Sequence, residues 1–426
     1  MQFCSIARRG RTWLLAALAL ALPAAPSLAG EAPASATPVT TVTLDRRGLN
    51  VGASDGAFSI HIGGRIHADG SWHVGDPGAG QGATDGTEIR RGRIDMRGTV
   101  GDEWGWFSEF DFADNDVAIK DLWFAYAGTD GLRRVAGHQK QPYSLAVEMS
   151  SNDIAFTERG IDNDLIIPFI DRAIGVRVDA WGEHWFTAAG FYGESIEPNK
   201  SGRDEGYGTA GRAVFSPIHD EQHVVHVGFR GAWRATPEND RMIQIRDETS
   251  HFSNLFVLDT DDIMNVSSVT LYGPEMGLTL GPVTFLGEYN RAHVNRSGRD
   301  LDFQSGHASV SWAITGESLA SAYRIDAGEY KRLSPDNPFS LRDGGCGAFE
   351  LGLRYAYLDV TDEDVRGGEE QALTSSLNWY ANDNLRLMFN YTDIVDTDRA
   401  RGLPSGSAGY EAEGMSVFTV RGQVTF

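Results

Sequence analysis

The chain has 426 residues, of which 41% are hydrophobic and 23% charged, and it carries a formal net charge of −22 at pH 7. So acidic a balance argues against nucleic acid as a partner. The two cysteines are Cys4 and Cys346, and Cys4 lies in an N-terminal segment that we expect to be removed. An intrachain disulfide is then excluded, and an exported chain of this size must be held together by other means.

The N-terminus has the composition of a secretory signal peptide. Three arginines precede an apolar run over 13–22, and Ser27-Leu28-Ala29 offers small residues for cleavage. The sequence therefore predicts a signal peptide over 1–29. The apolar run is too short for a membrane-spanning helix, which needs about 20 apolar residues, and no later stretch approaches that length. We expect an N-terminal periplasmic tail over 30–56 and, if the chain is a membrane protein, a β-barrel over 57–426.

Alternating segments of about ten residues recur beyond position 57, separated by Gly, Asp and Asn clusters. The clearest are 58–67, 91–100, 174–180, 225–234, 349–357 and 385–392. Each has one apolar face and one polar face, which predicts an all-β fold, a transmembrane antiparallel β-barrel of about 16 strands with 18 possible. A water-soluble β-sandwich has the same alternation, but the signal peptide, the even spacing and the terminal Phe favour the barrel.

The chain ends on one of these alternating segments. Phe418, Val420, Gly422, Val424 and Phe426 fall on one face, opposite Thr419, Arg421, Gln423 and Thr425. This ending resembles the C-terminal signature of bacterial outer-membrane barrels. We expect it to be the closing strand, paired with the first strand that carries Arg65, because a membrane barrel has no open edge.

Connections of two lengths separate the predicted strands. Tight turns are expected at Gly101-Asp102, at Gly182-Glu183 and over 381–384. Longer polar stretches occupy 196–206, 235–250, 294–300, 328–346 and 395–413. Short periplasmic turns and long external loops are typical of outer-membrane barrels, so we expect these longer stretches at the external end.

One stretch is too long for a hairpin connection. About 34 residues separate the strand that ends near Gly137 from the strand that starts near Arg172. The stretch contains Leu145, Val147, Phe156 and other apolar residues, so we expect it to be packed. Irregular backbone is tolerated at membrane depth where it lines a water-filled cavity. We predict a constriction loop over about 138–171 that narrows the lumen; an external loop packed on its neighbours is the alternative.

The alternation directs many arginines to the predicted lumen. They are Arg65, Arg91, Arg93, Arg97, Arg177, Arg230, Arg234, Arg324, Arg354, Arg386 and Arg421. Rings of Arg or Lys in a pore favour anions, and a guanidinium can donate two hydrogen bonds to one oxyanion. Carboxylates such as Asp95, Glu109 and Glu288 share these faces, so a pore lined by charges of both signs is an alternative interpretation. The face of Lys120 is ambiguous, because the alternation shifts by one around Asp121-Leu122.

The middle of the chain resembles the phosphate-selective porin O and P family, most strongly over about 57–193. The resemblance rests on Gly137, Lys140, Pro142, Ser144, Ser150-Ser151, Phe156, Glu158-Arg159 and Arg172-Ala173-Ile174-Gly175-Val176, with Gly64-Arg65, Arg91, Arg93 and Lys120-Asp121 before them. It implies an outer-membrane homotrimer of 16-stranded barrels that conducts anions, phosphate above all.

We therefore expect an outer-membrane porin for the passive diffusion of small anions, phosphate or related oxyanions, through an arginine-lined lumen. The candidate anion-binding residues are Arg65, Arg91, Arg93, Arg97, Lys120, Lys140, Arg159, Arg172, Arg177 and Arg230. Expected partners are small anions, outer-membrane lipid and further copies of the chain; no cofactor site is recognisable. Acids accompany the few basic residues of the predicted loop, among them Glu148, Glu158 and Asp162, which argues against narrow phosphate selectivity.

Two other functions remain open. A general mixed-charge diffusion porin would have much the same lumen, and a non-transporting adhesin or structural barrel would use its long loops as a binding surface. We expect no enzymatic activity, because the 11 histidines and the serines show neither a nucleophile elbow nor a paired-His spacing.

Overall fold

The computed structural model describes residues 39–75, 84–196, 204–398 and 414–426. The expected signal peptide, residues 1–29, lies outside the described residues, as do parts of the expected loops 196–206 and 395–413. Within the described ranges, no helix is both long and apolar enough to cross a membrane.

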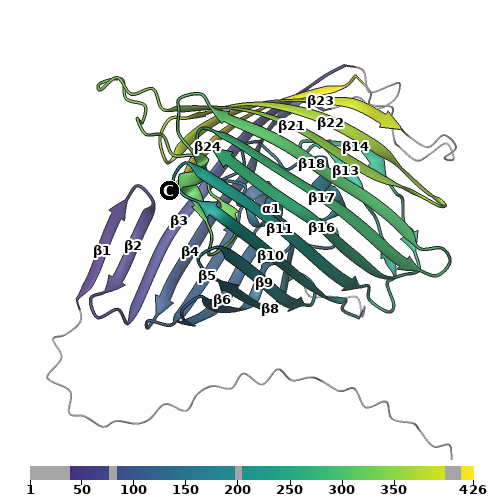
Figure 1. Ribbon diagram of the computed structural model, residues 1–426, viewed down its shortest axis with the longest axis horizontal. Coiled ribbons are helices and arrows are strands. Elements are labelled where there is room, and N and C mark those ends of the chain that lie inside the picture. The colour runs from purple at the N-terminus through teal and green to yellow at the C-terminus, as the bar shows by residue number, and fades with distance from the viewer. Residues whose placement is uncertain (1–38, 76–83, 197–203, 399–413) are drawn as a thin grey trace, which may run out of the picture. The chain divides into compact units, whose positions relative to one another are not determined.

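Sixteen strands close into an antiparallel barrel, and two more extend the same sheet (Figure 1). The barrel strands are β3 (Phe58–Val74), β4 (Gly86–Val100), β5 (Trp104–Asp111), β6 (Ala118–Thr129), β7 (Leu132–Lys140), β8 (Arg172–Trp181), β9 (Trp185–Tyr192), β10 (Tyr207–His219), β11 (His223–Ala235), β16 (Val266–Leu280), β17 (Val283–Arg296), β18 (Leu301–Ala313), β21 (Ala348–Asp362), β22 (Val365–Tyr380), β23 (Leu385–Asp398) and β24 (Ser416–Thr425). Each pairs with the next along the chain, which confirms the predicted barrel of about 16 strands.

The last strand closes the barrel against the first. β24 pairs with β3 from Ser416 opposite Val74 to Thr425 opposite Arg65. The backbone N–H of Phe426 then donates to the Gly64 carbonyl at 3.0 Å, and the Gly64 N–H donates to the Phe426 carbonyl at 2.7 Å. The expected pairing of the C-terminal strand is therefore confirmed.

An N-terminal hairpin covers the part of β3 that β24 leaves unpaired. β1 (Thr40–Asp45) pairs with β2 (Gly48–Ala53), and β2 pairs with β3 from Leu49 opposite Ile62 to Gly52 opposite Ser59. Residues 40–53, part of the expected tail, thus continue the sheet beside the start of β3 (Figure 1). The pairing follows from length. The last residue of the chain, Phe426, bonds Gly64 of β3, whereas β3 begins six residues before Gly64, at Phe58.

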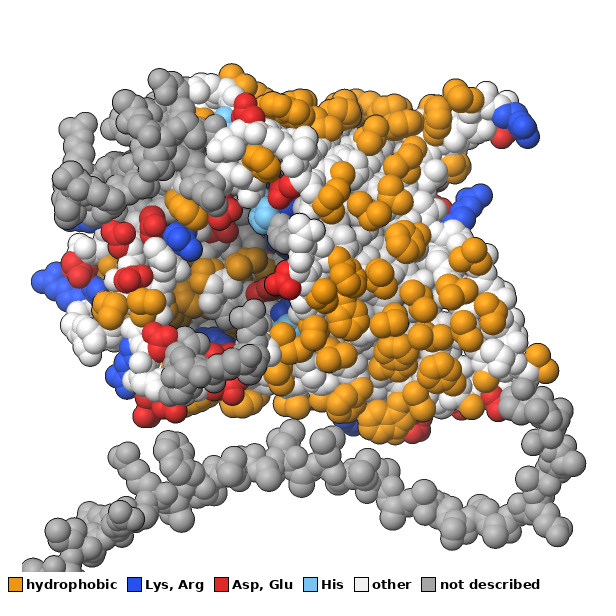
Figure 2. All heavy atoms as spheres, turned by 180° about the vertical axis from the view of Figure 1, so that it is seen from behind, with side chains coloured by type: hydrophobic (Ala, Val, Ile, Leu, Met, Phe, Trp, Pro, Cys, Tyr) orange, Lys and Arg blue, Asp and Glu red, His pale blue; other side chains and the backbone are white. Residues whose placement is uncertain are grey.

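The outward face of the barrel is apolar. Side chains such as Ile66, Val176, Phe229 and Leu353 are exposed, and Figure 2 shows hydrophobic side chains spread over the barrel wall. The residues that alternate with them, such as Arg65 and Arg177, are buried inside. An apolar band around a polar interior is the pattern of an outer-membrane barrel.

Most connections follow the expected asymmetry. The turns after β4, β8 and β22 are short, and Gly101 and Gly281 adopt the left-handed conformation in two of the turns at this end, with φ of 63° and 59°. We call this the periplasmic end, as short turns indicate.

The polar stretch 328–346 was expected at the external end, and that expectation is wrong. It belongs to the connection between β18 and β21, residues 314–347, which the antiparallel order of the strands places at the periplasmic end. This periplasmic segment contains η3 (Leu319–Ala322), β19 (Tyr323–Arg324) and β20 (Glu329–Tyr330). Arg324, expected on a barrel strand, lies in it and pairs with Asp326 at 2.7 Å.

The periplasmic segment folds into the barrel. Tyr330 is fully buried, and Arg212 on β10 donates to the Gly328 carbonyl at 2.7 Å. The Tyr323 hydroxyl lies 2.9 Å from Nδ1 of His226 on β11. Polar composition alone does not distinguish such a segment from an external loop, because both need solvated or hydrogen-bonded backbone.

The connection from β7 to β8 folds inward as predicted. This constriction segment, residues 141–171, contains α1 (Leu145–Glu148) and η2 (Ile161–Leu165). Its apolar side chains Tyr143, Leu165 and Ile166 pack with residues of β16 to β21, such as Leu271 and Phe303. The segment therefore lies against the wall opposite the strands that carry its two ends.

A third inward segment connects β11 to β16. Residues 236–265 form β12 (Met242–Ile243), β13 (Arg246–Ser250), β14 (Ser253–Asp259) and β15 (Ile263–Met264). Ile245, Val257 and Ile263 join the same apolar cluster as the constriction segment. The carboxyl of Asp247 on β13 also lies beside the carboxyls of Asp164 in η2 and Glu370 on β22.

Leu353→Arg should destabilise the folded barrel by about 2–4 kcal/mol in lipid, because Leu353 is an outward residue that is 44% exposed and a guanidinium there would face hydrocarbon. Urea unfolding in lipid vesicles measures the loss. Thr392→Arg, on the wall of an internal cavity, is the matched control and should change the free energy of unfolding by less than about 1 kcal/mol. Equal losses in the two variants would contradict the assignment of the faces.

Asp247→Asn should stabilise the protein above neutral pH. Burial and the adjacent Asp247 carboxyl raise the pKa of Asp164 well above its usual range, and burial raises the pKa of Asp247. Carboxyls with raised pKa values contribute stability at low pH that is lost as the pH rises through those values. Urea unfolding should show the variant more stable by about 1–2 kcal/mol near pH 8 and nearly unchanged near pH 5. The same difference at both pH values would contradict the raised pKa values of these two carboxyls.

Candidate functional site

The constriction segment leaves open space beside the wall from β3 to β8 and, in its outer part, beside β21 to β24. An outer cavity of about 570 Å³ is lined by residues that include Arg90, Arg91, Arg93 and Lys120. An inner cavity of about 470 Å³, toward the periplasmic end, is lined by residues that include Arg65, Arg97, Lys140 and Arg177. Arg172 at the start of β8 lines both cavities. A solute that passed from one to the other would therefore meet this guanidinium.

Two β-bulges add cations to the outer cavity. In the pairing of β3 with β4, His67 lies opposite Arg91 and Ala68 opposite Ile89, so Arg90 is the extra residue. In the pairing of β5 with β6, Lys120 is extra in the same way. In strict alternation, neighbouring residues such as Arg90 and Arg91 point to opposite faces of the sheet. A bulge interrupts the alternation, so Arg90 and Lys120 also line the cavity.

Alternating charges occupy the wall between the cavities. Arg93 donates to Asp111 at 2.6 Å and to Glu109 at 2.8 Å. Arg65 also bonds Glu109 and donates to Ser150 of the constriction segment at 2.8 Å. These guanidiniums are held in place by carboxylates, so their charges are largely compensated.

Arg172 and Lys120 differ in their partners. Arg172 donates to Asp121 at 2.9 Å and lies 3.8 Å from Glu109. Lys120 lines the outer cavity without an ion pair within 4 Å to any described residue. The ammonium of Lys120 is thus the least compensated cation beside the junction.

Two predicted site residues bind backbone instead. The Lys140 ammonium donates to the carbonyls of Val147 at 2.7 Å, Glu148 at 2.9 Å and Met149 at 3.2 Å. Arg159 donates to the carbonyls of Ala146 at 2.6 Å and Met149 at 2.8 Å. Both cations satisfy the carbonyls at the end of α1, where the helix dipole favours positive charge. Burial, with Arg91 nearby, lowers the pKa of Arg159 to about 10.

The remaining predicted residues are spread over the lumen. Arg97 is exposed on β4 toward the periplasmic end. Arg177 pairs with Asp179 at 2.5 Å and with Glu148 at 3.3 Å. Arg230 of β11 pairs with Glu288 at 3.0 Å, behind the constriction segment, and lines neither cavity.

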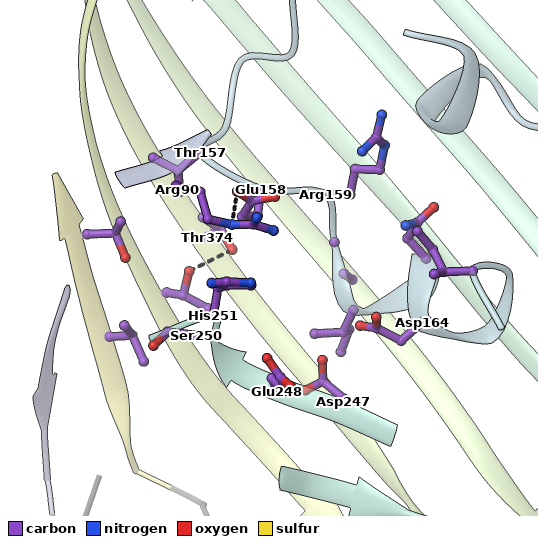
Figure 3. Close-up of a pocket in the computed structure, with 18 of the residues that line it drawn as sticks. Arg90, Thr157, Glu158, Arg159, Asp164, Asp247, Glu248, Ser250, His251 and Thr374 are labelled. Carbon is purple, nitrogen blue, oxygen red and sulfur yellow. Dashed lines mark hydrogen bonds and ion pairs between the residues drawn. The ribbon is translucent and has the colours of Figure 1, made fainter. Parts of the chain in front are cut away.

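Arg91 is paired with the constriction segment. It donates two hydrogen bonds to Glu158, at 2.7 and 2.8 Å. Arg90 and Arg421 lie within 3.2 Å and 2.7 Å of the same carboxylate, and Figure 3 shows Arg90 beside Glu158 on the cavity wall. Burial would raise the pKa of Glu158, but the guanidiniums of Arg91, Arg421 and Arg90 hold it well below its usual range.

Sequence reasoning missed Arg90, which lies one residue before the predicted strand 91–100. The signal was present as the adjacent pair Arg90-Arg91, since a second charge on a lipid face is costly and indicates a bulge. Arg212 was also missed; it is buried on β10 between Glu275 and the periplasmic segment. No local sequence pattern indicates that Arg212 pairs with Glu275 and with the periplasmic segment.

The sequence is similar to proteins of two bacteria. A protein of Caulobacter vibrioides is 29% identical over 405 residues, covering 91% of this chain and 79% of that protein. Porin O of Pseudomonas aeruginosa is 24% identical over 406 residues, covering 86% of this chain and 90% of that protein.

Solved porin structures share the fold. OmpT, an outer-membrane protein of Vibrio cholerae, matches with a TM-score of 0.56 at 11% identity, covering 87% of this chain and 98% of that one. An anion-selective porin from Comamonas acidovorans matches with a TM-score of 0.52 at 13% identity, covering 87% and 100%. The sequence profile described as "Phosphate-selective porin O and P" matches residues 60–426. With nearly the whole barrel matched, the chain belongs to the phosphate-selective porin O and P family, and it is an outer-membrane porin, a channel and not an enzyme.

Proposed function

We propose that this porin conducts small anions by passive diffusion, phosphate or related oxyanions among them, between the outer and inner cavities. The observation that supports this most directly is the junction, where Arg172 lines both cavities beside the unpaired Lys120. Cations at the narrow part of a pore favour anions, and a guanidinium suits an oxyanion because it can donate two parallel hydrogen bonds.

The raised pKa values of two nearby acids add to the preference for anions. Asp164 and Asp247 also line the outer cavity, and burial raises the pKa of both carboxyls, which favours their neutral form. A neutral carboxyl in this place would leave the cations of the cavity less opposed. The site residues named from the sequence remain proposals for anion binding, with Lys120, Arg172 and Arg97 the most accessible to a solute.

A general mixed-charge pore is the second candidate, and one observation favours it. Arg65, Arg93 and Arg172 each have a carboxylate partner, so the wall presents both signs along the path. A wall with charges of both signs would orient a solute but would discriminate only weakly between anions and cations. We also infer a homotrimer in the outer membrane, which remains a prediction from family membership.

Conductance in planar lipid bilayers separates these candidates. We expect the reversal potential in a KCl gradient to show anion preference, because Lys120 and Arg172 line the junction. Inorganic phosphate should then reduce the chloride current with saturation. A cation-preferring channel, or one whose chloride current phosphate does not reduce, would refute the phosphate proposal, and a folded protein without channel activity would favour the adhesin.

Lys120→Glu should lower the anion-to-cation permeability ratio at least about threefold, because it reverses an uncompensated charge beside the junction. Reversal potentials measure the ratio. Lys120→Arg should keep the wild-type ratio, and Arg299→Gln, at an external loop where the side chain is 77% exposed, should change it little. Equal ratios in wild type and the Glu variant would remove Lys120 from the path.

A further inference from the structure

Three guanidiniums from two strands converge on one carboxylate of the constriction segment. Arg91 binds Glu158 with two hydrogen bonds at 2.7 and 2.8 Å. Arg421 of β24 donates to it at 2.7 Å, and Arg90 lies 3.2 Å away. This is the arrangement that recognises a free oxyanion, with a bidentate fork and additional cations at the edges.

The cluster has more positive than negative charge. Arg421 also donates two hydrogen bonds to the Asp69 carboxylate, at 2.7 and 2.6 Å. Arg354 and Arg159 lie next to Glu158 but donate to backbone carbonyls, Arg354 to that of Glu158 itself at 2.9 Å. At ion-pair distance, the three guanidiniums of Arg90, Arg91 and Arg421 share two carboxylates, Glu158 and Asp69. Asp162 and Asp171 act on the more distant Arg354 and Arg159. Without Glu158 the excess would be larger, in a place where water is partly excluded.

The exposed fractions of the side chains show that Glu158 faces the outer cavity more than Arg91 and Arg421 do. The Glu158 side chain is 37% exposed in the outer cavity, whereas those of Arg91 and Arg421 are 6% and 0% exposed. The carboxylate thus lies between the cavity and the two arginines. An anion in the outer cavity meets Glu158 before it can use either guanidinium.

We propose that Glu158 is a tethered oxyanion, which fills an arginine site on the cavity wall and thereby weakens the binding of permeating oxyanions of the phosphate class. A conducting pore must bind its solute well enough to admit it and weakly enough to release it. Filling the strongest cationic site with a carboxylate of the chain itself meets the second condition. This inference rests on the proposed function, namely that small anions enter the outer cavity.

Glu158 is not needed to hold the constriction segment in place. The neighbouring backbone carbonyls of the segment are bound by Arg421 at Thr157, by Asn378 at Ala155 (2.7 Å) and by Arg386 at Ile154 (2.9 Å). These bonds do not involve the Glu158 carboxylate. Glu158→Gln should therefore fold, which heat-modifiable migration in gels verifies.

The test measures block of the chloride current by inorganic phosphate in planar bilayers. In Glu158→Gln, the phosphate concentration that halves the current should fall at least about tenfold, because the arginine site becomes available. The matched control is Glu88→Gln: Glu88 lines the same cavity, but its ion-pair partner among the described residues is His251, at 2.9 Å. The control should shift the half-blocking concentration less than about twofold.

An unchanged or higher half-blocking concentration in Glu158→Gln would overturn the inference, and so would equal shifts in the two variants. Should the Gln variant not fold, Glu158→Asp, which keeps the charge but reaches less far, should lower the half-blocking concentration at least about twofold; no decrease would overturn the inference. The proposed function fails separately, if the wild-type channel is not anion-selective and phosphate leaves its current unchanged. Phosphate block that appears only in Glu158→Gln would support the tethered oxyanion alone.

Discussion

The constriction segment crosses the lumen with an irregular backbone, and every buried polar group of that backbone needs a partner. The wall opposite its ends provides them. Arg354, Asn378, Arg386 and Arg421 on β21 to β24 donate to carbonyls of the segment, and Glu275 and Glu288 accept from its N–H groups at Leu145 and Ala146. The position of the segment, and hence the shape of the pore, depends on these side-chain to backbone hydrogen bonds.

This dependence divides the lumen arginines into two groups. Arg354, Arg386 and Arg421 on β21 to β24 are anchors, because each donates to a backbone carbonyl of the constriction segment, as Lys140 and Arg159 also do. Arg421 in addition pairs with Asp69 and Glu158. The arginines on β4 and β8 face the open side. There Arg90, Arg91, Arg93, Arg172 and Arg177 each have a carboxylate partner, whereas Arg97 and Lys120 have no ion pair within 4 Å to a described residue. Counting lumen arginines therefore overstates the charge available to a solute. Selectivity depends on the few cations left without a close partner and on carboxylates such as Glu158 that occupy the others.

The remaining inward segments act on the same space from both ends. The periplasmic segment reaches Asp153 of the constriction segment through Lys331, whose ammonium lies 3.7 Å from that carboxylate. From the external end, the Asp247 carboxyl lies beside those of Asp164 and Glu370. The constriction segment is thus held by three parts of the chain that are distant in sequence, which explains why its neighbours contain so many charged residues with low exposure.

The sequence by itself determined the barrel, its approximate strand number, its closing strand at Phe426 and the inward fold of the β7–β8 connection, because alternation and connection length are local properties. It also placed Arg65, Arg91 and Arg93 on the inner face. Only the tertiary structure decided which arginines are anchors, that 314–347 lies at the periplasmic end, and that bulges turn Arg90 and Lys120 inward. Those outcomes depend on partners such as Glu158 and Arg421, which lie 263 residues apart, and strand alternation contains no information about such pairs.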